Sequence, residues 1–224
     1  MKQNKIVIVI TGSIGTGKST AVNIIKDLGF HVLDSDKIVH EGYNKNNELY
    51  HNVVNYFGEE ILNEDRTINR MKLGKIVFND EECLKNLNNI VHIYVINALM
   101  KGVEESNSNV VFLDIPLILE NLKQEKEYGL MFDEIWLVYV SPETQIERLK
   151  SRALKENKNI EDVLNIIKKQ ISIDKKVSMV DEIIDNEGTI EDLELKIKEL
   201  LVKKGIGWWI YGKKAQYVRQ EKKS

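Results

Sequence analysis

The most constraining feature of the sequence is a glycine-rich segment that directly follows an unbroken run of β-branched residues. The run Ile6–Ile10 contains only isoleucine and valine, which predicts a strand buried on both faces of a parallel sheet. The segment Gly12–Ser19 matches the pattern G-x-x-x-x-G-K-[ST] in full, and residues 18–28 then show helical spacing closed by Gly29. A strand, a glycine loop and a helix in this order predict an α/β fold whose loop binds phosphate groups.

Each residue type in this loop has a physical reason. Glycines allow positive φ and bring backbone N–H groups close to phosphate oxygens, where the helix N-terminus adds partial positive charge. Lys18 is expected to reach the β- and γ-phosphates of a nucleoside triphosphate, and Ser19 to bind Mg²⁺ through its hydroxyl. A tight strand–helix turn with an incidental lysine is the alternative, which the complete pattern disfavours. The expected nucleotide contacts are Gly15, Thr16, Gly17, Lys18, Ser19 and Thr20.

Four more short apolar strands are predicted, each ending at polar residues or proline. They are Phe30–Leu33, Val110–Ile115, Glu134–Val140 and Glu182–Ile184. Because strands alternate with helical segments, we predict a doubly wound, five-stranded parallel sheet.

The uneven spacing of these strands indicates insertions. About 75 residues separate the second strand from the third, far more than one crossover helix needs. Helix-like segments at Asn46–Phe57, Asn69–Phe78 and Glu81–Glu105 fill this interval and predict a helical subdomain over residues 46–105. A second excursion, residues 142–174, is expected to form a basic lid. The expected organisation is one domain over residues 1–204, with a core of residues 1–45, 106–141 and 175–204, and an aromatic and basic tail over residues 205–224.

Composition excludes several classes of protein. A net charge of −3 and a pI of about 5.9 disfavour a dedicated nucleic-acid binder. One cysteine, Cys83, cannot form an internal disulfide, which favours a reducing compartment such as the cytoplasm. The apolar runs are shorter than the ~18 residues of a spanning helix, so no membrane partner is expected. The histidines and Cys83 lack metal-ligand spacing. For the tail, a packed or frayed terminus is favoured over a partner surface.

Carboxylates follow two of the predicted strands. Asp34 and Asp36 come after the second strand, and the carboxyl ends of parallel strands are where ligands bind. One carboxylate can accept a proton from an attacking hydroxyl while the other supports Mg²⁺. The alternative is that Asp36 only caps the next helix, and the phosphate loop one strand away favours the functional role. Asp114 ends the third strand and is a weaker candidate for a second Mg²⁺ carboxylate.

Two arginines lie in a basic segment of the second excursion. Arg148 and Arg152 are four residues apart, hence on one helix face, and guanidinium groups suit the charge that develops in phosphoryl transfer. A solvated basic face is the alternative, and residue pattern alone favours it.

The same layout favours a kinase over a GTPase. A guanine-reading Asn-Lys-x-Asp string after a strand is absent from the sequence. A helical insertion that binds an acceptor, with a lid that excludes competing water, fits a small-molecule kinase. A nucleotide or nucleoside kinase and a non-catalytic ATP-binding switch stay open as alternatives.

Taken together, the motifs resemble the dephospho-CoA kinase family across roughly residues 6 to 200. The matching segments are Ile10–Thr20 (T-G-G-I-G-S-G-K-S-T), Val32–Asp36 (V-I-D-A-D), Arg70–Phe78 (R-x-x-L-x…F), Ile115–Glu120 (P-L-L-F-E), Ser141–Arg152 (Q-x-x-R-x-x-x-R), the lid glutamine Gln170, and Asp181–Gly188 (A-D-x-V-I-D-N-x-G).

This resemblance implies an enzyme that uses ATP and Mg²⁺ to phosphorylate the ribose 3′-hydroxyl of dephospho-CoA. It makes Asp36 the base and Asp34 a supporting or Mg²⁺-binding carboxylate, and it gives Lys18, Arg148 and Arg152 the task of neutralising phosphates. The loop Asn186–Gly188 would lie against adenine through backbone contacts, with Asn186 and Gly188 as its contact residues. Residues expected to border the acceptor are Arg70, His92, Pro116 and Leu117. A monomer is expected, although self-association stays open.

Three positions depart from the family pattern. Ser13 stands where the family has a second loop glycine, and serine does not easily adopt positive φ. Ile93 follows His92 where the family usually has proline, so the helix geometry there is expected to differ. Ile118 and Leu119 replace Leu-Phe, which affects packing only.

Overall fold

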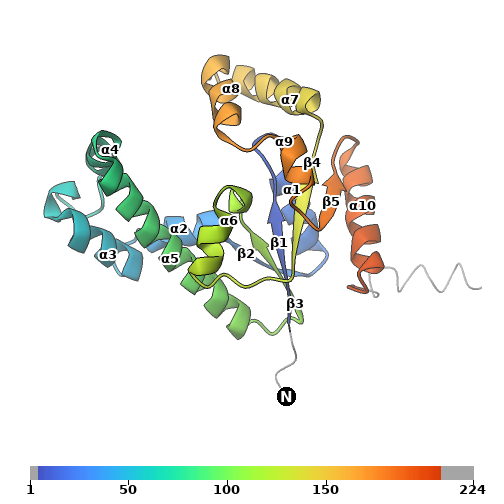
Figure 1. The fold of residues 1–224 in the computed structure, drawn as a ribbon, viewed down its shortest axis with the longest axis horizontal. Coiled ribbons are helices and arrows are strands. Elements are labelled where there is room, and N and C mark those ends of the chain that lie inside the picture. The colour runs from blue at the N-terminus through green and yellow to red at the C-terminus, as the bar shows by residue number, and fades with distance from the viewer. Residues whose placement is uncertain (1–4, 208–224) are drawn as a thin grey trace, which may run out of the picture. The chain divides into compact units, whose positions relative to one another are not determined.

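The computed structural model describes residues 5–207, which divide into two compact units (Figure 1). The first comprises residues 5–32, 108–120 and 132–207, and the second comprises residues 33–107 and 121–131. Among the described residues, no helix combines the length and the apolar character that crossing a membrane requires.

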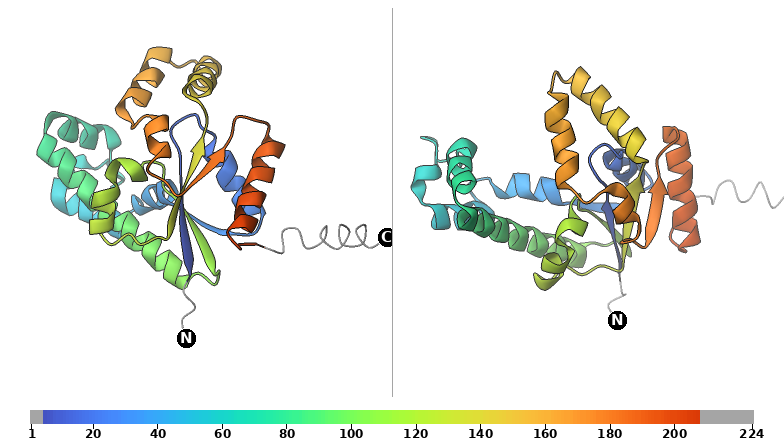
Figure 2. Two further views of the ribbon diagram at one scale, coloured as in Figure 1. Left: turned by 45° about the vertical axis from the view of Figure 1, so that its right-hand side comes forward. Right: turned by 45° about the horizontal axis from the view of Figure 1, so that its top comes forward.

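All five strands form one parallel sheet, as predicted. In the order β2-β3-β1-β4-β5 its strands are His31–Asp34, Val110–Asp114, Ile6–Thr11, Glu134–Tyr139 and Glu182–Asp185. The ribbon views show the strands side by side (Figure 2). In this register Ile8 of β1 lies beside Phe112 of β3 on one side and Glu134 of β4 on the other. The strand that precedes the glycine loop is therefore the central strand of the sheet.

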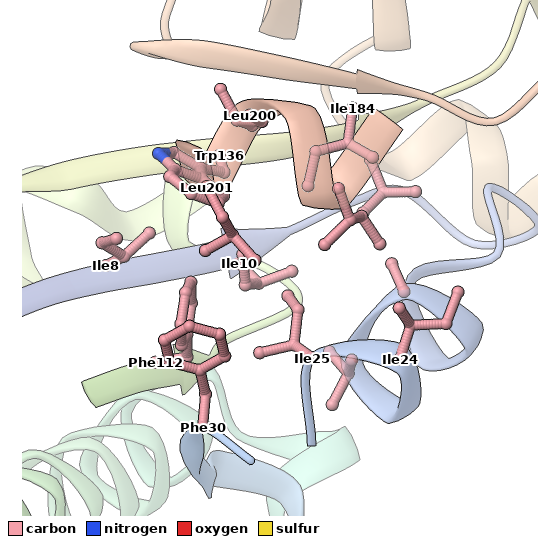
Figure 3. Packing of buried hydrophobic residues seen from close by; sticks show 14 of the residues in the cluster. Ile8, Ile10, Ile24, Ile25, Phe30, Phe112, Trp136, Ile184, Leu200 and Leu201 are labelled. Carbon is pink, nitrogen blue, oxygen red and sulfur yellow. The ribbon is translucent and has the colours of Figure 1, made fainter. Parts of the chain in front are cut away.

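Burial of β1 explains its unbroken apolar run. Ile8, Val9 and Ile10 are fully inaccessible to solvent, so successive side chains are buried on opposite faces. On one face Ile8 and Ile10 belong to a core cluster with side chains of α1 (Lys18–Asp27) and α10 (Ile190–Lys203) (Figure 3). Within this cluster the ring of Phe112 meets Phe30 and Trp136 edge-on, with centroids 5.4 and 5.6 Å apart.

Gly29 ends α1 in the way its position predicts. Its φ is +90°, a left-handed conformation that glycine adopts without steric penalty. The N–H of Gly29 donates to the carbonyl of Lys26, and the N–H of Phe30 donates to that of Ile25. These two bonds satisfy carbonyl groups at the end of the helix and turn the chain into β2.

The second excursion of the chain is a helical hairpin of α7 (Pro142–Lys155) and α8 (Ile160–Lys169), followed by α9 (Ile173–Val177) (Figure 2). Ser141 caps α7 by accepting from the N–H of Thr144. Asn157, in the turn between the helices, has a φ of +52°, which asparagine tolerates better than most residues. This hairpin occupies the lid region predicted from sequence and belongs to the first unit.

Helices make up the second unit. They are α2 (Ser35–Gly42), α3 (Glu48–Phe57), the 3₁₀ helix η1 (Glu59–Ile61), α4 (Arg70–Asn79) and α5 (Glu81–Glu105). The helix α6 (Ile118–Glu127) is kinked at Asn121, where the chain enters this unit. A separate core of α3, η1 and α4 includes Leu49, Val53 and Ile61, each fully buried. α5 has the predicted bounds and runs unbroken through Ile93.

After α10 the chain still contributes to the core. Ile206 is 5% exposed and belongs to the same cluster as Ile8 and Leu201. Residues 208–224, which carry most of the predicted aromatic and basic tail, lie outside the described residues.

Candidate active site

The glycine loop between β1 and α1 has the backbone that its sequence predicts. Gly15 and Gly17 have φ values of +86° and +84°, a region that strongly favours glycine. Ser13 is not among the described non-glycine residues with positive φ, which are Arg66 and Asn157. A serine therefore fits the position where the family pattern has a glycine.

Two hydrogen bonds within the loop fix the carbonyl of Ser13. The N–H of Thr16 donates to the carbonyl of Ser13 at 3.2 Å, and the Thr16 hydroxyl donates to the same oxygen at 2.9 Å. Within residues 5–207, no hydrogen bond uses the N–H groups of Gly15 or Gly17. A loop with fixed carbonyls and unused N–H groups at a helix N-terminus is a site for an anion.

Lys18 pairs with the carboxylate at the end of β3. Its Nζ contacts Oδ1 of Asp114, and the two side chains are only 13% and 8% exposed. Asp114, the weaker Mg²⁺ candidate, thus has a cationic partner in this structure, and its role toward Mg²⁺ stays a prediction. The pair holds the ammonium group at the loop, where a polyphosphate would compete with Asp114 for its N–H donors.

Asn186 connects three parts of the site. Its side-chain Nδ2 donates to the carbonyl of Thr16 at 2.7 Å, and a Cβ on Gly17 would lie 2.2 Å from the same nitrogen. Nη2 of Arg148 donates to the backbone carbonyl of Asn186 at 2.8 Å. The sequence predicted Asn186 as a backbone contact to adenine and missed this side-chain role, because no local pattern reports a partner in a distant loop.

The loop after β5 is joined to the start of α7 by Glu187. Its carboxylate accepts from the N–H of Ser141 and, at 2.7 Å, from the hydroxyl of Thr144. These bonds hold the pKa of Glu187 below its usual range. Gly188, the other predicted adenine contact, is exposed, and a Cβ there would lie 2.6 Å from Oδ2 of Asp192, whose side chain forms a capping box with Thr189 at the start of α10.

Both predicted lid arginines lie on α7 and line one groove of about 510 Å³ with five other residues of that region. Their partners differ: Arg148 binds the Asn186 carbonyl, whereas Nε of Arg152 lies 2.8 Å from Oε1 of Glu156. Lys158 and Arg152 together lower the pKa of Glu156 to about 2, so that carboxylate stays ionised. The groove residues are Thr144, Glu147, Arg148, Ser151, Arg152, Lys155 and Glu156.

The two candidate aspartates have different local roles in the second unit. Asp34 is the N-cap of α2, and its Oδ1 accepts from the N–H of Lys37 at 3.0 Å. Asp36 is exposed in the first turn of the same helix. The capping alternative considered for Asp36 is therefore wrong: capping belongs to Asp34, because its extended backbone (φ −108°, ψ 113°) aims the side chain at the first turn.

Two predicted acceptor residues are also placed in the second unit. Arg70 begins α4, and its guanidinium lies 5.9 Å from the ring centroid of Tyr43. Nδ1 of His92 contacts Oε1 of Glu125, whose side chain is 9% exposed. Glu125 was not predicted from sequence; it orients the imidazole ring of His92.

The other two acceptor candidates, Pro116 and Leu117, follow β3 in the first unit. The carbonyl of Pro116 accepts from the hydroxyl of Thr11 at 2.8 Å, and Leu117 is 43% exposed.

A buried ion pair lies shortly after these residues, where Glu120 contacts Lys176 of α9 with Oε1 and Nζ 2.7 Å apart. Lys176 is fully buried, and sequence analysis did not single it out. Among residues 5–207, no three histidine, cysteine or acidic side chains converge to hold a metal ion.

The central strand, the glycine loop at a helix N-terminus and the arginine-bearing hairpin define a P-loop kinase. The family model for dephospho-CoA kinase matches residues 6–192. The chain belongs to the dephospho-CoA kinase family, and it is thus an ATP-using phosphotransferase of coenzyme A biosynthesis.

Individual relatives agree with this assignment. The chain is 38% identical over 200 residues to the dephospho-CoA kinase of Carboxydothermus hydrogenoformans, covering 88% of this chain and 93% of that protein. It is 38% identical over 191 residues to that of Aquifex aeolicus, covering 85% and 93%. The crystal structure of TT1252 from Thermus thermophilus superposes with a TM-score of 0.71 at 30% identity, covering 89% of this chain and 98% of that one. The dephospho-CoA kinase from Campylobacter jejuni gives a TM-score of 0.60 at 27% identity, with coverage of 89% and 98%.

Proposed function

We propose that the chain transfers the γ-phosphoryl group of ATP to the ribose 3′-hydroxyl of dephospho-CoA, in one in-line step without a covalent enzyme intermediate. The observation that carries the proposal is the hydrogen-bond chain from Arg148 through Asn186 to the carbonyl of Thr16, two residues before Lys18 in the same loop. Cations and N–H groups fixed before reaction stabilise the charge of a phosphoryl transition state without reorganisation.

In this proposal Asp36 accepts the proton of the 3′-hydroxyl as its oxygen attacks the γ-phosphorus. The bond from the γ-phosphorus to the β–γ bridging oxygen breaks, and ADP leaves with that electron pair. Asp36 is suited to this role because it is exposed and Asp34 supplies the helix cap. Lys18, Arg148 and Arg152 neutralise the phosphates, and Arg70, His92, Pro116 and Leu117 border the acceptor.

Mg²⁺ fits the oxygen donors that the chain offers. The hydroxyl of Ser19 is exposed in the first turn of α1, and the cap of α2 uses Oδ1 of Asp34, which leaves Oδ2 for a cation. Ser19 and Asp34 are therefore the residues that would hold it. When bound, Mg²⁺ neutralises charge on the β- and γ-phosphates.

We also propose that residues 1–204 act as one kinase domain with an acceptor subdomain at 46–105 and a lid at 142–174. A monomer in the cytoplasm is the proposed state of the protein. The single cysteine, Cys83, which cannot form an internal disulfide, supports the reducing compartment.

A coupled assay of ADP release tests the proposal. Dephospho-CoA, AMP, CMP and no acceptor are compared at equal ATP and Mg²⁺ concentrations, together with a dephospho-CoA analogue that lacks the 3′-hydroxyl. We expect turnover with dephospho-CoA alone. Equal rates with and without dephospho-CoA would indicate a simple ATPase or switch, and preference for AMP or CMP would indicate a nucleotide kinase.

A further inference from the structure

Two glutamines hold the phosphate loop at one residue, Ile14. Nε2 of Gln145 donates to the carbonyl oxygen of Ile14 at 2.7 Å. The N–H of Ile14 donates to Oε1 of Gln170 at 3.4 Å, a longer bond. Both backbone polar groups of Ile14 are thus used by side chains 131 and 156 positions away in the sequence.

The glutamines stand at the two ends of the helical hairpin. Gln145 lies in the first turns of α7 and is 3% exposed, and Gln170 is the C-cap residue of α8. Leu149 follows Gln145 by one helical turn, and a Cβ on Gly15 would lie 2.8 Å from its Cγ. One face of α7 therefore supports both Ile14 and Gly15.

Peptide geometry gives the Gln145 bond a consequence at the ligand. The carbonyl of Ile14 and the N–H of Gly15 belong to one planar, trans peptide group, so they point in opposite directions. A hydrogen bond that fixes the carbonyl also fixes the direction of the N–H. The preceding peptide group is fixed at both ends, because the Ser13 carbonyl accepts from Thr16 and the Ile14 N–H donates to Gln170.

We infer that Gln145 and Gln170 are positioning residues that aim the Gly15 N–H at a phosphate group of ATP. Gln145 does so as a donor and Gln170 as an acceptor, and through them the ends of the lid hairpin set the geometry of the phosphate loop. This inference rests on the proposed function only in taking ATP as the ligand of the loop.

The opposite hydrogen-bonding roles make a sharp test. Gln145→Glu replaces the donor with an oxygen that faces the Ile14 carbonyl, whereas Gln170→Glu keeps an acceptor for the Ile14 N–H. Both glutamates add a negative charge beside the loop and so weaken ATP binding in each variant, but we expect Gln145→Glu to lose at least about tenfold more affinity than Gln170→Glu, which keeps its hydrogen bond. Calorimetric titration of ATP into the full chain measures both. Asn165→Asp, the same amide-to-acid change at an exposed position of α8, is the matched control.

A positioning role also predicts which constants move. The Kd and KM for ATP should rise in Gln145→Glu while the KM for dephospho-CoA stays unchanged; a loss of folding would instead lower the active fraction and therefore Vmax, without raising either KM. Gln145→Met, which keeps the shape and removes the donor, gives the same comparison if the glutamate variant does not fold. Wild-type ATP affinity in Gln145→Met, or equal losses in the two glutamate variants, overturns the inference. A wild-type chain that binds ATP without phosphorylating dephospho-CoA would refute the proposed function alone.

Discussion

The side-chain amide of Asn186 donates a 2.7 Å hydrogen bond to the carbonyl of Thr16, which lies 170 positions earlier in the chain. The bond is buried, and the same nitrogen occupies the space that a Cβ on Gly17 would need. The loop after β5 and the phosphate loop therefore form one connected structure, to which Arg148 is attached through the Asn186 carbonyl.

Replacing Asn186 should loosen this structure. Asn186→Ala leaves the buried Thr16 carbonyl without a donor, which costs about 1–3 kcal/mol in the free energy of unfolding. We also expect weaker ATP binding, because the loop backbone loses a fixed point. Denaturant unfolding and ATP titration measure the two effects, and Asn165→Ala on the exposed face of α8 is the control. Wild-type values for both would contradict the role assigned to the amide.

Lys18 should contribute mainly to the transition state. Lys18→Ala removes a cation held at the phosphates, and we expect a loss of several kcal/mol in transition-state stabilisation, by analogy with other fixed charge-stabilising groups. Steady-state kinetics with saturating dephospho-CoA measure kcat/KM for ATP. A decrease smaller than about tenfold would show that the ammonium group does not act on the transferred phosphoryl group.

Asp114 offers a separate test of the same pair. Asp114→Asn leaves the Lys18 ammonium, which is 13% exposed, without its charged partner. Breaking a buried pair from one side destabilises a fold by roughly 3–5 kcal/mol in well-isolated cases. We therefore expect a lower midpoint of thermal unfolding, and a larger rise of that midpoint with ATP than wild type shows, because ATP supplies a replacement anion. A rise no larger than that of wild type would show that the pair is not at the phosphate site.

Asparagine at each aspartate tests the local role assigned to it. Asp34→Asn keeps a side-chain oxygen for the Lys37 N–H, so α2 should remain capped and the fold stable. Asp36→Asn removes the proposed base, and turnover should be abolished while ATP still binds. Thermal unfolding of Asp34→Asn checks the cap. Turnover assays and ATP titration of Asp36→Asn check the base. Near-normal turnover of Asp36→Asn would remove Asp36 from the base role.

A pH-dependent contribution to stability is expected at the end of α10. Lys204 lies 2.8 Å from Glu182, and its hydrogen bond holds the pKa of Glu182 below the usual range. Because the folded pKa is the lower one, this stabilisation is complete above the unfolded pKa, near 4.3, and is lost as the pH falls through the folded value.

Lys204→Gln should therefore unfold at a lower temperature than wild type at pH 7, with a gap that narrows below about pH 4. Thermal unfolding from pH 7 to pH 3 measures the gap. Lys168→Gln, at an exposed lysine of α8, controls for the change in net charge. A gap that stays constant over this range would show that the pair does not titrate with folding.

Features decided by neighbouring residues were predictable from the sequence. The β-branched run of β1, the left-handed Gly29 and the glycines of the phosphate loop all follow from local conformational preference. α5 could be predicted to the residue because its apolar spacing is regular and Asp80 caps it from outside. The pattern G-x-x-x-x-G-K-[ST] also located the phosphate loop, since its residues are contiguous.

Features decided by topology could not be predicted in this way. Partners of Gln145, Asn186 and Lys176 lie in distant segments, and a polar residue in sequence carries no record of which backbone group it meets. The helix α8 was missed for another reason: it lay inside a segment interpreted by its charge, although Ile160, Val163, Leu164 and Ile167 recur at helical spacing after the N-cap Asn159. The missed pairings have one cause: contacts between distant segments depend on the order of strands in the sheet.

The order of strands in the sheet has a consequence for synthesis of the chain on the ribosome. β1 leaves the ribosome first, yet its partners β3 and β4 begin at Val110 and Glu134. At roughly 5–20 residues per second, the most apolar strand of the chain waits several seconds with both edges unpaired. Its cluster stays incomplete until Ile206 has emerged. The nascent chain should therefore engage chaperones early, while both edges of β1 are still unpaired.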